Sequence, residues 1–143
     1  MWFRDIPVER DAGYVRCAST ALWGELKLGP LLSSFGLAAE PSFLHEVASD
    51  KAAQVLAAIL HQDMAYKTEA MPRARAEQLA YEFVASQEAG AKFLVNADWS
   101  EYFAPKQGPS SFGWKGLTES TFDAGVLAIG QRYASCVWVE DED

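Results

Sequence analysis

TFDAGVLAIGQRYASCVWVEDED is the sequence of residues 121–143, and it contains two β-prone runs separated by Gly130-Gln131-Arg132. A short connection with a glycine between two such runs predicts a β-hairpin. Apolar residues fall on both faces of each run, which predicts that the hairpin is covered on both sides. We therefore expect the hairpin at the centre of a sheet, with the other elements arranged around it.

The hairpin sequence ends in a run of four carboxylates: Glu140, Asp141, Glu142 and Asp143. Like charges in a small volume repel one another strongly unless a cation lies nearby. We expect this acidic C-terminal end at the surface. It would serve either as a solvated, solubilising tail or as a docking site for a basic partner.

The composition indicates a single globular domain with an acidic surface. The chain has 143 residues, half of them hydrophobic, and a formal net charge of −8. This length predicts one domain, residues 1–143, with a core that needs neither disulfides nor metal. Nucleic acids and anionic membranes attract basic faces, so we expect neither as a partner. A basic protein is the partner that such a charge attracts.

We expect neither a signal peptide nor a membrane span. Its first residues, MWFRD, are not followed by an apolar segment of the kind found in signal peptides, and no apolar run reaches the length of a membrane span. Cys17 and Cys136 lie far apart in apolar stretches, where cysteine is most often a small buried hydrophobe. We expect a cytoplasmic protein without disulfides.

The first third of the chain contains three weaker patterns. Residues 2–8 predict a short edge strand, because Pro7 suits an edge better than a centre. Residues 12–27 repeat apolar side chains at helical spacing and predict a helix. Residues 30–41 are apolar without a period, which predicts a packed connector.

The middle of the chain has clearer signals. Residues 50–65 and 72–88 each carry a one-sided apolar stripe, so we expect two helices that pack on a sheet. Residues 91–96 predict a short strand. Residues 97–120 combine turn residues with aromatic side chains, which is typical of a binding surface or of a lid folded back on the core.

Together these elements predict an α+β fold in a single domain. Two central helices pack on an antiparallel sheet that includes the C-terminal hairpin, 121–139. The strand at 91–96 and the N-terminal strand at 2–8 are its further members. The helix at 12–27 covers the remainder.

The sequence contains no motif that specifies a reaction. His61 and Asp63 are two residues apart in one helix and so point about 200° apart, which prevents them from forming an orienting pair within it. The segment at 108–113 fits neither a serine nucleophile elbow nor a phosphate-binding loop. The usual zinc spacings do not occur, so we expect no metal and no cofactor.

One locally basic spot surrounds the bend between the two central helices, with Lys67, Arg73 and Arg75 beside Tyr66. Arginine forms bidentate pairs with carboxylates. These side chains would therefore either pair with the acidic end or form a binding edge.

Four stretches resemble small acidic bacterial immunity-type proteins, which neutralise a toxin by binding it and have no catalysis of their own. They are AILHQDMAY at 58–66, AEQLAYEFV at 76–84, KFLVN at 92–96 and the ending TFDAGVLAIG with CVWVEDED. The resemblance implies a cytoplasmic inhibitor that covers a toxin's site with an acidic and aromatic surface. The contact residues that it implies are Trp99, Tyr102, Trp114, Glu140, Asp141, Glu142 and Asp143.

Two other functions stay open at this stage. One is a small hydrolase or metal-dependent enzyme that uses His61, Asp63 and the C-terminal carboxylates. The other is a structural subunit of a larger assembly, with the apolar residues at 30–39 as its interface. We favour the protein-binding function over both.

Overall fold

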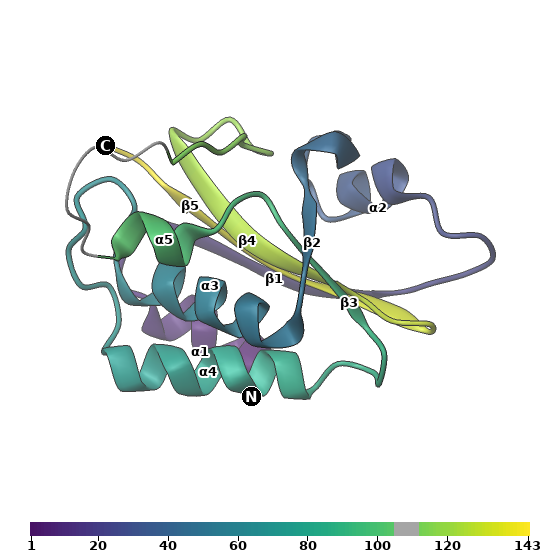
Figure 1. Ribbon diagram of the computed structural model, residues 1–143, viewed down its shortest axis with the longest axis horizontal. Helices are drawn as coiled ribbons and strands as arrows, with labels where there is room; N and C mark the ends of the chain where they lie inside the picture. Colours follow the sequence, from purple (N-terminus) through teal and green to yellow (C-terminus); the bar gives the residue numbers. More distant parts are fainter. Residues whose placement is uncertain (105–111) are drawn as a thin grey trace.

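The computed structural model describes residues 1–104 and 112–143 of the chain. Within them, five strands form one sheet with the order β1-β5-β4-β3-β2, and every neighbouring pair is antiparallel (Figure 1). The strands are β1 (Tyr14–Ala21), β2 (His45–Val47), β3 (Lys92–Val95), β4 (Phe122–Ile129) and β5 (Tyr133–Asp141). The predicted α+β fold is confirmed.

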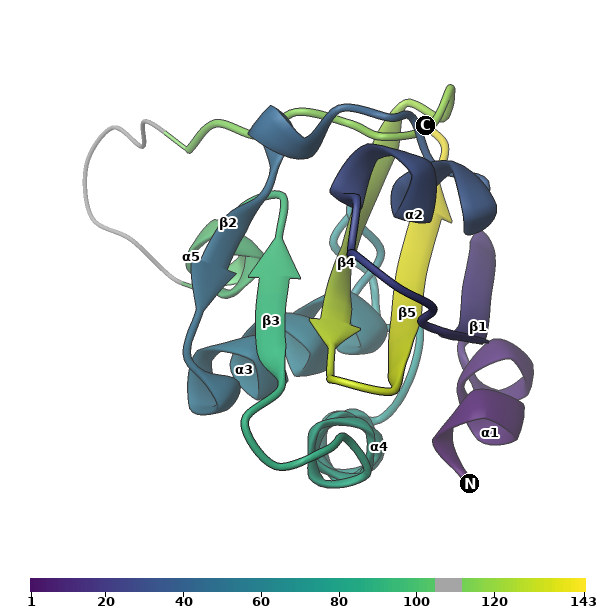
Figure 2. The ribbon, with the colours of Figure 1, turned by 90° about the vertical axis from the view of Figure 1, so that its right-hand side faces the viewer.

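Helices cover both faces of the sheet. The described residues form the helices α1 (Trp2–Glu9), α2 (Leu28–Ser34), α3 (Ser49–His61), α4 (Arg73–Ala85), α5 (Trp99–Phe103) and the short 3-10 helix η1 (Pro41–Phe43). Helices α1, α3, α4 and α5 pack on one face, whereas α2 and η1 lie against the other (Figure 2). The sheet therefore separates two hydrophobic cores.

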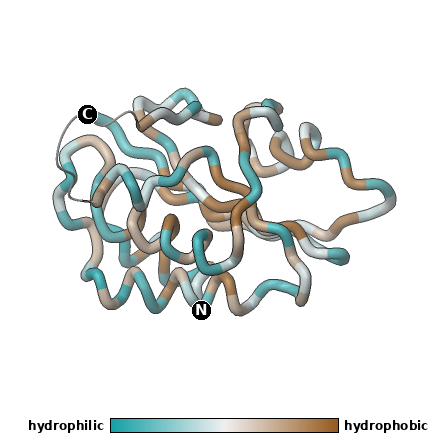
Figure 3. The backbone as a smooth tube through the Cα atoms, viewed as in Figure 1, coloured by the Kyte–Doolittle hydropathy of each residue, from teal (hydrophilic) through white to brown (hydrophobic). Residues whose placement is uncertain are grey.

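The predicted hairpin is confirmed as the centre of this arrangement. Strands β4 and β5 each contain six consecutive buried residues. Ala124 and Val126 belong to the core beneath α3 and α4, whereas Leu127 and Trp138 belong to the core beneath α2. Figure 3 shows apolar residues along these central strands. Because successive side chains of a strand point to opposite faces of the sheet, this one hairpin contributes side chains to both cores.

The two central helices are confirmed: α3 begins one residue earlier and ends four residues earlier than predicted, and α4 is shorter at both ends. Helix α3 buries Ala52, Val55, Leu56, Ile59 and Leu60, and helix α4 buries Ala76, Leu79, Ala80 and Phe83. These are the apolar stripes of the sequence, so the 3.6-residue period identified the buried faces correctly. The strand predicted at 91–96 is confirmed as β3.

Both predictions for the N-terminal segment are wrong. Residues 2–8 form helix α1, because Trp2 and Ile6 lie one turn apart and are both buried. Residues 14–21, predicted as part of a helix, form strand β1 and pair along their whole length with β5. The N-terminal part of the chain therefore contributes an edge strand through β1 and not through residues 2–8. Apolar spacing alone did not distinguish a strand from a helix here.

The predicted connector at 30–41 contains more structure than expected, namely most of α2 and the start of η1. Its apolar side chains are buried in the core beneath the sheet: Leu31, Leu32, Phe35 and Leu37. They leave little apolar surface at 30–39 for an assembly interface.

The region 97–120 begins with the short helix α5, where the Asp98 carboxylate accepts a hydrogen bond from the Glu101 N–H. The part of this predicted loop at 105–111 lies outside the described residues. From Phe112 the chain leads to Leu117, which is buried against the sheet face that carries α2. Among the described helices, none is long and apolar enough to cross a membrane.

Candidate functional site at the acidic end of the sheet

The two groups of residues predicted as contacts lie at the same end of the sheet. Phe122, the first residue of β4, pairs with Asp141, the last residue of β5. The Trp114 ring stacks on Phe122 with 5.9 Å between ring centroids. Helix α5 and the end of β5 lie on the same side of the molecule (Figure 1). The fold thus places the aromatic cluster beside the acidic end.

Trp99 is the centre of the aromatic cluster and is fully buried. Its ring centroid lies 5.2, 5.0 and 5.1 Å from those of Tyr102, Phe112 and Trp114. The indole N–H donates to Asn96 Oδ1 at 3.1 Å. Trp99 therefore supports the site from the core, and the side chains of Tyr102, Phe112 and Trp114 are partly exposed.

Tyr102 connects the cluster to the bend that follows α3. Its hydroxyl donates to the Met64 carbonyl oxygen at 2.9 Å, and the Lys67 ammonium lies 4.3 Å from the ring centroid. Burial raises the pKa of Tyr102, and the nearby Asp63 carboxylate adds to this shift. Tyr102 therefore stays a neutral hydrogen-bond donor at physiological pH.

Asp141 is not on the surface, so the expectation of four exposed carboxylates is wrong for this residue. Its carboxylate receives two hydrogen bonds of 2.8 Å from Arg10, and neither side chain is exposed. The Met64 N–H donates to the same carboxylate at 2.9 Å. Arg10 also donates to the Ile59 carbonyl oxygen at 2.9 Å. This buried pair ties together the ends of α1, α3 and β5.

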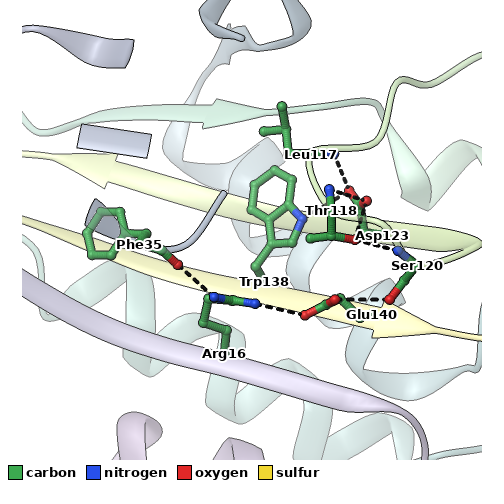
Figure 4. A network of polar contacts seen from close by, with 8 residues as sticks. All are labelled: Arg16, Phe35, Leu117, Thr118, Ser120, Asp123, Trp138 and Glu140. Atoms are coloured by element: carbon green, nitrogen blue, oxygen red, sulfur yellow. Dashed lines mark hydrogen bonds and ion pairs between the residues drawn. The ribbon is translucent and has the colours of Figure 1, made fainter. Parts of the chain in front are cut away.

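Glu140 is half-buried and also has internal partners. Arg16 Nη2 lies 3.1 Å from Glu140 Oε2, and the Ser120 hydroxyl donates to Oε1 at 2.9 Å (Figure 4). Arg16 Nη1 donates in turn to the Phe35 carbonyl oxygen at 2.9 Å. Asp141 and Glu140 are therefore paired with Arg10 and Arg16. Pairing with the basic spot near 66–75, one of the two roles considered for that spot, does not occur for these two carboxylates.

Asp123 is a buried carboxylate that sequence reasoning missed. It accepts hydrogen bonds from the Leu117 N–H at 3.0 Å, the Thr118 N–H at 2.9 Å and the Trp138 indole at 3.0 Å (Figure 4). These bonds hold the segment before β4 against the hairpin. A single Asp inside an apolar run was the available signal, because an acid survives there only with several donors.

Glu142 and Asp143 are the exposed members of the predicted acidic set. The Thr121 hydroxyl donates to Glu142 Oε2 at 2.5 Å, and the Thr121 N–H lies 3.2 Å from Oε1. These hydrogen bonds lower the pKa of Glu142. Glu119 is exposed on the adjacent turn. Within the described part of the chain, none of these three carboxylates forms an ion pair.

The residues of the enzyme alternative all have structural partners. His61 Nδ1 lies 2.8 Å from the Met71 carbonyl oxygen, and Asp63 Oδ1 accepts from the Tyr66 N–H at 2.7 Å. Across residues 1–104 and 112–143, no three His, Cys, Asp or Glu side chains lie close enough to hold a metal ion. Burial raises the pKa of Cys17 to about 12, so its thiol is protonated at physiological pH.

The basic spot is also used by the fold. Arg75 donates to Glu9 from Nε at 2.8 Å and from Nη2 at 2.7 Å, which ties α4 to α1. Arg73 lines a cleft of about 480 Å³ between α3, α4 and α5, together with His61 and Glu77.

The comparisons with known proteins give no relative. No protein-family model, no curated protein and no solved structure matches this chain.

Proposed function

We propose that this protein is a non-enzymatic binding module that docks a basic protein partner on the acidic end of its sheet. The most specific form of the proposal is an immunity-type inhibitor of a basic toxin. The observation that carries it is the exposed group Glu119, Glu142 and Asp143, hereafter the acidic surface. A cationic side chain of a partner would complete the ion pairs that these carboxylates lack.

The internal ion pairs explain why the acidic surface keeps its charge. The two nearest arginines, Arg10 and Arg16, are bound to Asp141 and Glu140. Neither guanidinium is left to neutralise the carboxylates farther out. The net charge of −8 adds a long-range field of the same sign. Such a field raises the association rate of a basic partner more than it slows release.

The surroundings of the acidic surface supply a rigid support. Thr121 orients Glu142, and Asp123 holds the segment that carries Glu119. The partly exposed rings of Tyr102 and Trp114 lie beside this end and rest on buried Trp99. Rigid aromatic side chains give contact area at low entropy cost. In this proposal the carboxylates speed the association of a basic partner, and the aromatic rings supply the contact area that holds it.

Affinity capture with matched variants tests the proposal. Tagged wild-type protein, Glu142→Gln/Asp143→Asn and the control Glu25→Gln/Glu46→Gln are each incubated at low salt with extract from the native host. Both double variants remove two negative charges from exposed positions, and the control positions lie in the loop after β1 and on β2. We expect one basic, stoichiometric partner with the wild type and the control, and its loss with the first variant.

Two results would contradict the proposal. One is a partner that the wild type and both variants retain equally, because the acidic surface would then contribute nothing. The other is the lack of any stoichiometric partner in extract from cells that express the protein.

A further inference from the structure

Strand β1 lies at one edge of the sheet and is bonded only to β5. None of its eight residues is fully buried, in contrast to the buried runs of β4 and β5. Helix α1 packs on one face of the sheet beside it and does not continue the sheet (Figure 2). The outer side of β1 therefore presents unpaired backbone groups.

The hydrogen bonds identify which backbone groups point outward. The Leu22 N–H, directly after β1, donates to the Arg132 carbonyl oxygen at 2.9 Å. Residues of an antiparallel edge strand alternate between bonding inward and pointing outward. The outward groups are therefore those of Val15, Cys17, Ser19 and Ala21. Within the described chain, none of them has another backbone or side-chain partner.

The two edges of the sheet differ in how they are protected. Strand β2, at the opposite edge, has three residues, with His45 and Glu46 exposed. Short length and charge are the usual devices that prevent further pairing at an edge. Strand β1 is eight residues long, contains no proline or lysine, and its one charged residue, Arg16, is bonded inward to Phe35 and Glu140. Apart from this arginine, β1 therefore has neither the short length nor the charged side chains that protect β2.

Exposed apolar side chains gather in the elements that flank this edge. Of the eight large exposed ones in the described residues, six belong to α1, to Met1 before it, to β1 or to the loop that follows β1. Trp23 is 87% exposed, Val8 82% and Tyr14 58%. The full set of six is Met1, Phe3, Val8, Tyr14, Trp23 and Leu26. Exposed apolar side chains therefore flank both ends of this edge strand, and apolar surface of this kind is typical of an interaction site.

We propose that a second copy of this chain pairs with the outer edge of β1, antiparallel, so that the two sheets join into one. A two-fold axis through Ala18 brings Val15 opposite Ala21 of the partner subunit and Cys17 opposite Ser19 of the partner subunit. In this register all four outward residues of each copy find a partner. This interface is distinct from the acidic surface and does not depend on the proposed function.

Charge favours a second copy as the occupant. At this register Arg16 faces the partner's Thr20, so no two like charges oppose each other across the interface. The carboxylates nearest to β1 on α1, Asp5 and Glu9, are already paired with Arg75. Because the strands run in opposite directions, the two acidic ends lie at opposite ends of the joined sheet. Two chains of net charge −8 therefore meet along a strand whose one charged side chain, Arg16, is already paired with Glu140.

Two substitutions at one position test the register. Thr20 is half-buried, and no hydrogen bond from its side chain is present in the described structure. Thr20→Lys places a lysine opposite each Arg16, which raises the dimer dissociation constant about tenfold. Thr20→Glu places a carboxylate opposite each Arg16 and lowers the constant by a similar factor. The measurement is sedimentation equilibrium over a range of concentrations, with a monomer mass of 15.7 kDa.

A third variant tests the backbone pairing. Ala21→Pro removes an outward N–H but no bond to β5, so the monomer keeps its thermal stability while the dimer loses a hydrogen bond in each copy. Hydrogen exchange followed by NMR gives an independent result. In the dimer the amides of Val15, Cys17, Ser19 and Ala21 become protected as the concentration rises, whereas the inward amides are protected at every concentration.

The expected result is a mass that rises from 15.7 kDa towards twice that value with concentration, and that responds oppositely to Thr20→Lys and Thr20→Glu. A constant monomer mass with rapid exchange of the four outward amides would overturn the proposal. A dimer that is insensitive to all three variants would overturn it as well, because the copies would then meet elsewhere.

Discussion

Arg10 and Asp141 face each other through two hydrogen bonds of 2.8 Å, with both side chains shielded from solvent. Each remaining polar atom of the pair is directed at backbone, including the Ile59 and Gln62 carbonyl oxygens and the Met64 N–H. A buried ion pair offsets its desolvation cost only with such complete bonding. The pair closes the acidic end of the sheet against α1 and α3.

Asp141→Asn should destabilise the protein strongly. The substitution leaves the Arg10 guanidinium buried without its counterion, which costs about 3 to 5 kcal/mol. Urea denaturation followed by tryptophan fluorescence measures the change in the free energy of unfolding. Asp143→Asn is the matched control, because Asp143 is exposed, and we expect a change below about 0.5 kcal/mol. Equal changes in the free energy of unfolding for the two substitutions would contradict a stabilising role of the buried pair.

Gly125→Ala should disturb the centre of the hairpin. Gly125 pairs with Trp138, and a Cβ at residue 125 would overlap the indole ring and the Val137 carbonyl oxygen. Overpacking of this kind costs about 1 to 3 kcal/mol. Near-ultraviolet circular dichroism and thermal unfolding report the change. Gly113→Ala is the control, since no atom of residues 1–104 or 112–143 lies within 4 Å of its added Cβ, and its melting temperature should stay unchanged.

The hairpin could be predicted from sequence because the residues that specify it are neighbours in the chain. Two short β-prone runs flank Gly130-Gln131-Arg132, and apolar residues fall on both faces of each run. Strand β1 could not be predicted in the same way. Its apolar residues, among them Val15 and Ala18, also fit a helical spacing. The strand forms because β5 offers a free edge, and that edge lies more than a hundred residues away in the chain.

The candidate site was partly predictable for a similar reason. The acidic run and the aromatic residues are visible in the sequence, and the fold brings them together. Which of them are exposed depends on distant partners. Asp141 is buried because Arg10, 131 residues away, lies opposite it. Trp99 is buried because the chain around Phe112 and Trp114 folds over it. Local patterns do not contain such contacts.

The ion pair between Arg75 and Glu9 should make stability depend on acid pH. Hydrogen bonding and charge attraction from Arg75 lower the folded-state pKa of Glu9 below its ordinary value of 4.5. A group with a lowered folded pKa stabilises the protein above its unfolded pKa. That stabilisation is lost as the pH falls through the folded pKa. Unfolding free energies measured between about pH 5 and 3 should therefore fall with acidification.

Arg75→Gln identifies the source of this slope. Without the guanidinium, the pKa of Glu9 returns towards its ordinary value, and the unfolding free energy depends less on pH in this window. Lys92→Gln is the control, because Lys92 is exposed and the described structure shows no ion pair for it. Identical slopes for the wild type and Arg75→Gln would refute the assignment to this pair.

The salt dependence of partner binding is the last prediction, and it rests on the proposed function. The acidic surface lies exposed to solvent, where added salt screens charges over about 10 Å at 0.1 M. Raising the salt concentration should therefore slow association markedly and speed dissociation only slightly, because the aromatic contacts are not screened. Surface plasmon resonance with the purified partner separates the two rates.

Glu142→Gln/Asp143→Asn should flatten the salt dependence of association, and Glu25→Gln/Glu46→Gln should leave it as in the wild type. A dissociation rate that carries most of the salt effect would place the charged groups inside the contact and contradict the division of roles between carboxylates and rings.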